Sequence, residues 1–294
     1  MTADGGDTLL QDFERRLLAL EQAFEKLRAA IDPAFAVANV AAPIAASLLK
    51  VDGQHAFSAK FFALLDLGEA VLKYSAAIGF ASVMQANTPQ SSDIVELFRR
   101  PPSLGKIVER LRKILDDSSS RALWPMTLVT DALRRANGKQ TSAARYLFEE
   151  FIAIRNSERG HGTHQPEGYY EELYLKNRYI LEDFVLSSDL LSTTLVYIHS
   201  VDHYGEQYSY KVTRLMGAVP IDIPDPIISP TKVRMHSTCV WDGAARLLAL
   251  AEFVVYRFCK QCCSEHTFFA DHMTPDRVFL QSYPGSHRIE VERR

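Results

Sequence analysis

The sequence has few cysteines and lacks the features of a secreted or membrane protein. Only four of its 294 residues are cysteine, and all four lie in the last 56 residues without the spacing of a disulfide framework. The longest apolar stretch, residues 34–49, contains Asn39 and Pro43 and is shorter than the ~20 residues that span a bilayer. Residues 2–12 are polar and acidic where a signal peptide needs an apolar core. We therefore expect a cytoplasmic protein with no membrane partner.

Several catalytic motifs are also missing. The sequence has no glycine-rich phosphate loop with lysine, no His-Glu-x-x-His and no credible Ser/His/Asp set. Cys259-Lys-Gln-Cys262 looks like half of a zinc-ribbon turn, but zinc takes four ligands and no second Cys-x2-Cys follows. Four residues nearby could complete such a site: Cys263, His266, His272 and His287. Free thiols remain the favoured interpretation, and we expect no metal and no cofactor.

The sequence has no overall excess of positive charge, but positive residues are concentrated in one segment. The net charge of −3 argues against a protein that coats nucleic acid at large. Residues 98–159, however, hold 13 Lys/Arg and 7 Asp/Glu, a net charge of +6, whereas the flanking segments are both acidic. A local positive field of this kind is expected of an RNA-binding site. The alternative is that these residues only form solvated helix faces.

Apolar residues recur at spacings of three and four over most of the first 192 residues, which is typical of amphipathic helices. The pattern predicts helices over residues 8–31, 58–86, 104–115, 124–136, 141–156 and 169–188, with a short helical turn at 94–98. Small residues in the second helix, among them Gly68, allow a neighbour to approach closely. Ser103 is placed to cap the helix after it. The alanine-rich stretch 34–50 is ambiguous.

The pattern changes after Ser192. Residues 193–199 and 207–213 are β-branched and aromatic runs, with a turn expected at Asp202–Gly205. Further strand candidates are residues 232–236, 247–258, 267–269, 278–280 and 288–291. The sequence thus predicts an α+β protein, with a helical domain over residues 1–192 and a small β-rich domain over residues 193–294.

One stretch combines residues suited to phosphate chemistry. Between Phe148 and Gly162 a helical apolar face continues into Arg155, which lies in the middle of that face at about 100° per residue. Asn156 follows, and His161 stands between two glycines that end the helix. Arginine offers a planar fork for phosphate oxygens, and histidine exchanges a proton near neutral pH. The stretch therefore predicts a phosphate site at a helix end.

Arg155, Asn156 and His161, with five residues between the arginine and the histidine, resemble the signature of the HEPN superfamily. That signature is Arg, a polar residue that is often Asn, and His after four to six intervening residues. The resemblance covers roughly residues 55 to 190. It implies a helical bundle that pairs as a homodimer, with two copies of the motif at the interface forming a metal-independent ribonuclease site. Members of this family act as toxins or antiviral defence effectors.

The resemblance gives each motif residue a role. His161 would shuttle the proton when a ribose 2′-hydroxyl attacks, Arg155 would stabilise the charged phosphorane, and Asn156 would orient His161 or the phosphate. RNA and a second copy are then the expected partners, and the β-rich domain would sense a signal or bind a partner protein. Two alternatives remain open. The chain could be an inactive scaffold or regulatory subunit of a multi-protein defence complex, or Arg155 could simply pair with a local carboxylate such as Glu150.

Overall fold

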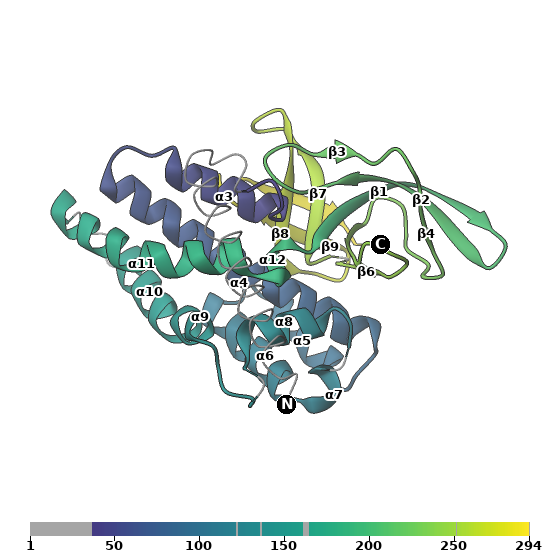
Figure 1. Ribbon diagram of the computed structural model, residues 1–294, viewed down its shortest axis with the longest axis horizontal. Coiled ribbons are helices and arrows are strands. Elements are labelled where there is room, and N and C mark those ends of the chain that lie inside the picture. The colour runs from purple at the N-terminus through teal and green to yellow at the C-terminus, as the bar shows by residue number, and fades with distance from the viewer. Residues whose placement is uncertain (1–36, 122, 136, 161–164, 251, 294) are drawn as a thin grey trace, which may run out of the picture.

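The structure is a computed structural model, and it describes residues 37–121, 123–135, 137–160, 165–250 and 252–293. Helices come first along the chain and two antiparallel sheets follow, so the α+β class is confirmed (Figure 1). The helix expected over residues 8–31 and the motif histidine, His161, both lie outside the described residues. Among the described residues, no helix combines the length and apolar composition that crossing a membrane requires.

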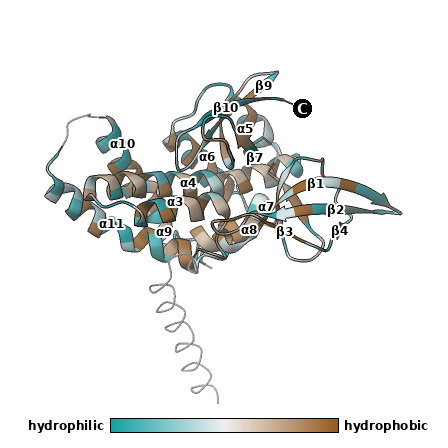
Figure 2. Cartoon of the chain, turned by 90° about the horizontal axis from the view of Figure 1, so that it is seen from above, coloured by the Kyte–Doolittle hydropathy of each residue, from teal (hydrophilic) through white to brown (hydrophobic). Residues whose placement is uncertain are grey.

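Helix α4 (Phe57–Gln85) forms the centre of the helical part, and it confirms the helix expected over residues 58–86. Of its 29 residues 20 are buried, so it is surrounded by other elements rather than lying on the surface. Three helices pack along it: α3 (Ala42–Asp52), α6 (Leu104–Asp116) and α11 (Glu167–Ser187). Figure 2 shows apolar segments along α3 and α4 in the middle of the helical part.

The remaining α-helices within the described residues are short. They are α5 (Ser91–Phe98), α7 (Ser118–Arg121), α8 (Met126–Leu133), α9 (Ser142–Arg145), α10 (Ile152–Gly160) and α12 (Asp189–Ser192). The expected cap of α6 is confirmed, because the Ser103 hydroxyl accepts a hydrogen bond from the Lys106 backbone N–H at 3.4 Å. Helix α8 is shorter than the predicted span 124–136.

The motif segment is not the single α-helix expected over residues 141–156. A π-helix, η1 (Tyr146–Phe151), separates α9 from α10, and α10 continues to Gly160. A π turn accommodates one more residue than an α turn. Here it is lined with bulky side chains, and four of its six residues are buried: Tyr146, Leu147, Phe148 and Phe151. Because the apolar period is interrupted at this turn, the sequence pattern alone could not locate it.

The first sheet is built around the hairpin of β1 (Thr194–Tyr204) and β2 (Gln207–Arg214), which projects from the body of the molecule (Figure 1). The strand order is β3-β2-β1-β5-β6, with β4 paired to β2. The other strands are β3 (Ile221–Asp222), β4 (Ile227–Ser229), β5 (Thr238–Trp241) and β6 (Leu247–Ala249). Strand β1 runs to Tyr204, so the turn expected at Asp202–Gly205 is tighter than predicted.

Two details of the strand prediction are wrong. Residues 232–236 form no strand, because His236 has a φ of 63°, a left-handed conformation that cannot continue an extended chain. The run 247–258 is two strands rather than one, since β6 ends at Ala249 and β7 begins at Val254. The two strands belong to different sheets.

The second sheet has the strand order β10-β9-β8-β7. Its members are β7 (Val254–Cys259), β8 (Ser264–Met273), β9 (Arg277–Ser282) and β10 (Arg288–Glu292). Buried side chains of this sheet share one continuous hydrophobic core with the helices, whereas part of the first sheet has a separate smaller cluster. Next to β7, the Phe253 ring lies 5.8 Å from that of Phe80 and 5.5 Å from that of Phe98, centre to centre. The division into two domains at residue 192 stays a prediction.

Gly68 allows the close approach that the small residues of α4 suggested. A Cβ atom at this position would lie 2.3 Å from a ring carbon of Phe151, which is itself buried. We expect Gly68→Ala to destabilise the fold. Alanine gains ~1 kcal/mol of helix propensity, but overpacking a filled core costs ~1–3 kcal/mol, and the buried Phe151 ring would have to shift to make room. Urea unfolding should show a net loss.

Gly168 in α11 is the matched control for Gly68, because a Cβ there meets nothing within 4 Å. Gly168→Ala should therefore leave the free energy of unfolding unchanged or slightly raised. Equal stability of Gly68→Ala and wild type would contradict the packing described here.

Candidate functional site

The motif arginine is anchored by a buried carboxylate on α4. Glu69 is 2% exposed, and its Oε1 accepts a hydrogen bond from Arg155 Nε at 2.8 Å. The Arg155 side chain is itself 28% exposed, so it contacts Glu69 on one side and solvent on the other. The pairing joins residues 86 positions apart in the chain. The alternative partner considered from the sequence, Glu150, is exposed and is not the carboxylate that Arg155 binds.

The Glu69 carboxylate has two further donors as partners. Arg159 Nη1 lies 2.7 Å from the same Oε1, and the hydroxyl of Tyr283, in the turn between β9 and β10, donates to Oε2 at 3.0 Å. From its position on α4, this one carboxylate thus binds both α10 and the second sheet. Burying a charge in this way is tolerated only when it is paired and hydrogen-bonded.

A second carboxylate extends this network. Asp66 lies one turn before Glu69 on the same face of α4, and it accepts hydrogen bonds from Arg159 and from Lys50 Nζ, the latter at 3.1 Å. Three cations therefore share two carboxylates, which leaves an excess of positive charge beside the motif. Such an excess favours an anionic ligand such as a phosphate.

Asn156 follows Arg155 on α10 and is exposed. Its side-chain Oδ1 accepts a hydrogen bond from Arg155 Nη1 at 3.1 Å. The structure thus brings together two of the three predicted site residues, Arg155 and Asn156. The third, His161, lies outside the described residues, and so does His164.

The charges of the cluster shift the pKa values of its members. Burial by itself would raise the pKa of Glu69, but the hydrogen bond from Arg155 and the charges of Arg159 and Arg155 outweigh it, so the pKa lies below its ordinary value of 4.5. Lys73, one turn further along α4, has a lowered pKa because burial penalises its charged form more than Glu69 favours it. Its Nζ lies 5.0 Å from the centre of the Tyr283 ring.

The residues that complete the cluster were not identified from the sequence. Glu69, Asp66, Arg159 and Tyr283 come from segments far apart in the chain, and periodicity does not reveal such contacts. One signal was present, however. Asp66 and Glu69 are three residues apart in a largely apolar helix, a place where acidic side chains need partners.

Much of the positive charge in residues 98–159 is locally neutralised. Arg99, Arg110, Arg112, Lys113 and Arg134 each lie within ion-pair distance of an acidic side chain. These pairs are mostly exposed and contribute little stability. They favour the interpretation of this segment as solvated helix faces more than that of one uniform positive surface.

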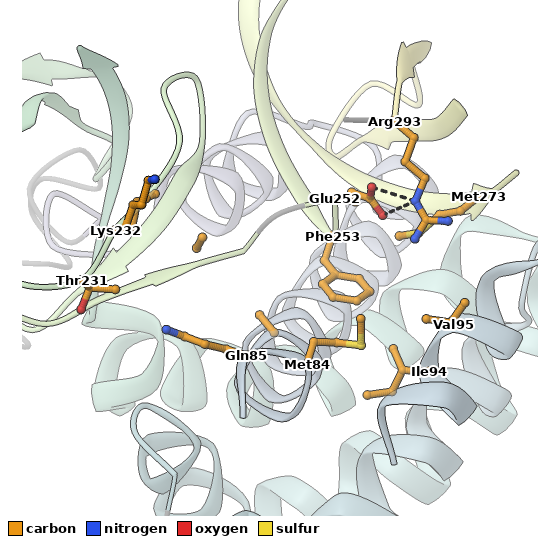
Figure 3. A pocket seen from close by; sticks show the side chains of 13 residues that line it. Met84, Gln85, Ile94, Val95, Thr231, Lys232, Glu252, Phe253, Met273 and Arg293 are labelled. Atoms are coloured by element: carbon orange, nitrogen blue, oxygen red, sulfur yellow. Dashed lines mark hydrogen bonds and ion pairs between the residues drawn. The ribbon is translucent and has the colours of Figure 1, made fainter. Parts of the chain in front are cut away.

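A cavity of about 320 Å³ lies elsewhere, between the end of α4, α5, the segment before β5 and the start of β7 (Figure 3). Its lining is mainly apolar, with Met84, Ile94 and the ring of Phe253 facing inward, and Lys232 stands at its edge. At one side Arg293 Nε donates to both carboxylate oxygens of Glu252, at 2.8 and 3.0 Å. Neither Arg155 nor Asn156 lines this cavity.

Comparison of the chain with protein-family models, with curated proteins and with solved structures finds no match.

The anchoring role of Glu69 predicts a pH-dependent loss of stability. We expect Glu69→Gln to lower the free energy of unfolding by ~3–5 kcal/mol at pH 7, the cost of breaking a buried ion pair. Because the folded-state pKa is depressed, this stabilisation is present above the ordinary pKa of 4.5 and is lost as the pH falls through the lower folded value. Thermal unfolding of the variant and of wild type should thus converge in acid.

Glu150→Gln is the control, since Glu150 is an exposed glutamate close to the motif. It should change the free energy of unfolding by less than ~0.5 kcal/mol. A loss as large as that of Glu69→Gln, or a Glu69→Gln difference that does not shrink as the pH is lowered from 7 into acid, would contradict the anchor.

Proposed function

We propose that the chain is a metal-independent endoribonuclease of HEPN type, acting on RNA as a toxin or antiviral effector. The observation that carries the proposal is the state of Arg155, which is fixed at Nε by a buried carboxylate while its side chain stays 28% exposed. An arginine held in this way needs no reorganisation when charge develops on a phosphate. Its position, next to Asn156 and with five residues between it and His161, matches the motif spacing.

In this proposal Arg155 stabilises the negative charge of the pentacoordinate phosphorane. Arg159 shares the Glu69 carboxylate and adds a second guanidinium beside it. His161 takes the proton of the ribose 2′-hydroxyl and returns a proton to the departing 5′-oxygen, so that the products are a 2′,3′-cyclic phosphate and a free 5′-hydroxyl. Asn156 orients the phosphate or His161, while its Oδ1 stays on Arg155.

The proposed site is composite, so a homodimer is part of the proposal. Helix α11 carries exposed apolar side chains along one stripe, including Leu175 at 46%, Tyr179 at 71% and Leu186 at 48% exposure. It also contacts the motif helix, because the Tyr169 hydroxyl donates to Glu158 at 2.7 Å. Exposed apolar side chains that gather on one face are typical of protein–protein contacts. We infer that α11 pairs with a second copy.

A second candidate function is a catalytically inactive HEPN-like scaffold or regulatory subunit. The observation in its favour is that Arg155 and Arg159 both pair with Glu69, so the motif arginine also holds helices together. In that case Arg155 would matter for stability and not for RNA cleavage. The β-rich part would supply the contacts with a partner protein.

The nuclease proposal predicts a large loss of RNA cleavage in His161→Ala. General acid–base groups contribute ~10²- to 10⁴-fold in rate, so the loss should fall in that range with unchanged thermal stability. Cleavage by wild type should continue when Mg²⁺ and Mn²⁺ are omitted. His164→Ala, which removes the next imidazole along the chain, is the matched control and should cleave at the wild-type rate. Arg155→Lys keeps the charge but removes the fork, and it should also be impaired.

Two results would count against the nuclease. Equal cleavage by His161→Ala and wild type would remove the role given to this histidine. Absence of cleavage by the wild-type dimer, over a range of single-stranded and structured RNAs at low salt, would favour the scaffold.

The dimer is tested by placing charges on α11. Leu175→Glu with Tyr179→Glu should convert a dimer of about twice the 33.1 kDa chain mass into a monomer in multi-angle light scattering. Val219→Glu is the control, because Val219 is equally apolar and 67% exposed but lies outside α11. A wild-type chain that stays monomeric at high micromolar concentration would contradict the composite site.

A further inference from the structure

A group of sulfur and nitrogen ligands converges at one end of the second sheet. Cys259 is the last residue of β7, Cys262 lies in the hairpin loop before β8, and His287 precedes β10. The two sulfur atoms and a ring nitrogen of His287 all lie within 4.8 Å of one another. The distance from Cys259 Sγ to His287 Nδ1 is 3.4 Å.

The strand register accounts for this convergence. Cys259 pairs with Ser264 across the β7–β8 ladder, and because strand side chains alternate, His266 lies on the same face as these two residues. Strand β9 brings in His287, since Ser282 pairs with Phe268 of β8. Two hydrogen bonds then fix the turn after β9: Ser282 N–H donates to the His287 carbonyl at 2.9 Å, and His287 N–H donates to the Ser282 side-chain Oγ at 3.2 Å.

His266 supplies a fourth donor. Its Nε2 lies 3.0 Å from Cys262 Sγ, and its ring centre lies 5.9 Å from that of His287 at an angle of 85°. The other two residues that the sequence offered are turned to different contacts. His272 stacks on Phe279 with 4.2 Å between ring centres, and Cys263 Sγ faces the Lys260 carbonyl at 3.9 Å.

Three of these ligands already fit a tetrahedral zinc centre. Zn–S bonds of ~2.3 Å and Zn–N bonds of ~2.0–2.1 Å at tetrahedral angles place sulfur and nitrogen ligands roughly 3.5 Å apart. The Cys259–His287 distance of 3.4 Å agrees with that value. His266 contacts Cys262 Sγ at 3.0 Å but lies outside the group of three whose ligand atoms are all within 4.8 Å of one another, so its ring must move toward Cys259 and His287 to complete the tetrahedron. We propose that Cys259, Cys262, His266 and His287 bind one Zn²⁺ ion as a closed structural site.

The two cysteines are available as ligands. Thiolate and neutral imidazole are the forms that bind zinc. All four cysteines are free, so Cys259 and Cys262 are not already joined in a disulfide.

Zinc would connect two turns of the second sheet. The ion would join the β7–β8 loop to the turn between β9 and β10, which is the turn that also carries Tyr283. Because all four positions would be filled by protein, no open coordination site would remain for a substrate. The role assigned to the ion is therefore to stabilise the sheet, and the proposal does not depend on the ribonuclease activity.

The test is a metal analysis of the full chain, expressed with zinc in the medium and purified without chelator. Mass spectrometry of the metal content should give about one zinc per chain, as a four-ligand structural site predicts. Cys262→Ser and His287→Ala should each lower the zinc content by about tenfold or more, since each removes a ligand. Cys263→Ser is the matched control, an exposed cysteine next to Cys262, and it should retain the wild-type content.

Cobalt substitution tests the ligand set first on the wild-type chain and then on one variant. Co²⁺ bound by two thiolates and two imidazoles should give intense tetrahedral ligand-field bands and thiolate-to-cobalt charge-transfer absorption, and His266→Ala should change them. Folded wild type with less than about a tenth of a zinc per chain and no cobalt bands would overturn the proposal, as would a Cys259–Cys262 disulfide in its place. Equal zinc loss in Cys263→Ser, or an unchanged cobalt spectrum in His266→Ala, would overturn the assigned ligands.

Discussion

The buried carboxylate of Glu69 is the constraint on which the rest of the structure depends. A charge at 2% exposure can persist only with partners, and its three donors come from two separate parts of the chain. Arg155 and Arg159 fix the position of α10 on α4, and Tyr283 fixes the second sheet on the same helix. The apolar contact of Phe253 with Phe80 and Phe98 also joins the second sheet to the helices, because these three rings pack together in the core between them.

The helices and strands that follow from local periodicity could be predicted from the sequence. Helix α4 and the strands of the β1–β2 hairpin follow from spacings of three to four and of two, and both appear within a few residues of the expected bounds. The π turn before α10 escaped prediction, because it interrupts the period on which the prediction relied. The strand expected at 232–236 failed for a similar local reason, since the left-handed conformation of His236 leaves no mark on hydropathy.

For the candidate site, the sequence pointed to Arg155 and Asn156 but not to the side chains that hold Arg155 in place. The contact of Arg155 with Glu69 joins residues 86 positions apart, and that of Tyr283 with Glu69 joins residues 214 apart. Neither contact can be inferred from the spacing of residues in the sequence. The cysteine and histidine cluster shows the same limit. Cys259 and Cys262 were recognisable as half a site, but only the register of β8 against β9 selects His287 from the available histidines.

The long separation of Tyr283 from Glu69 has a consequence for synthesis of the chain. At a ribosomal rate of ~5–20 residues per second, the phenol emerges ~10–40 seconds after the carboxylate that it binds. Until Phe253 emerges, late in that interval, α4 can contact its helical neighbours, but the faces of Phe80 and Phe98 that meet Phe253 stay uncovered. The helical part must therefore persist for a time as an incompletely covered intermediate. Exposed apolar surface of this kind is what chaperones bind, so we expect the nascent chain to depend on them most between completion of the helices and arrival of the last strands.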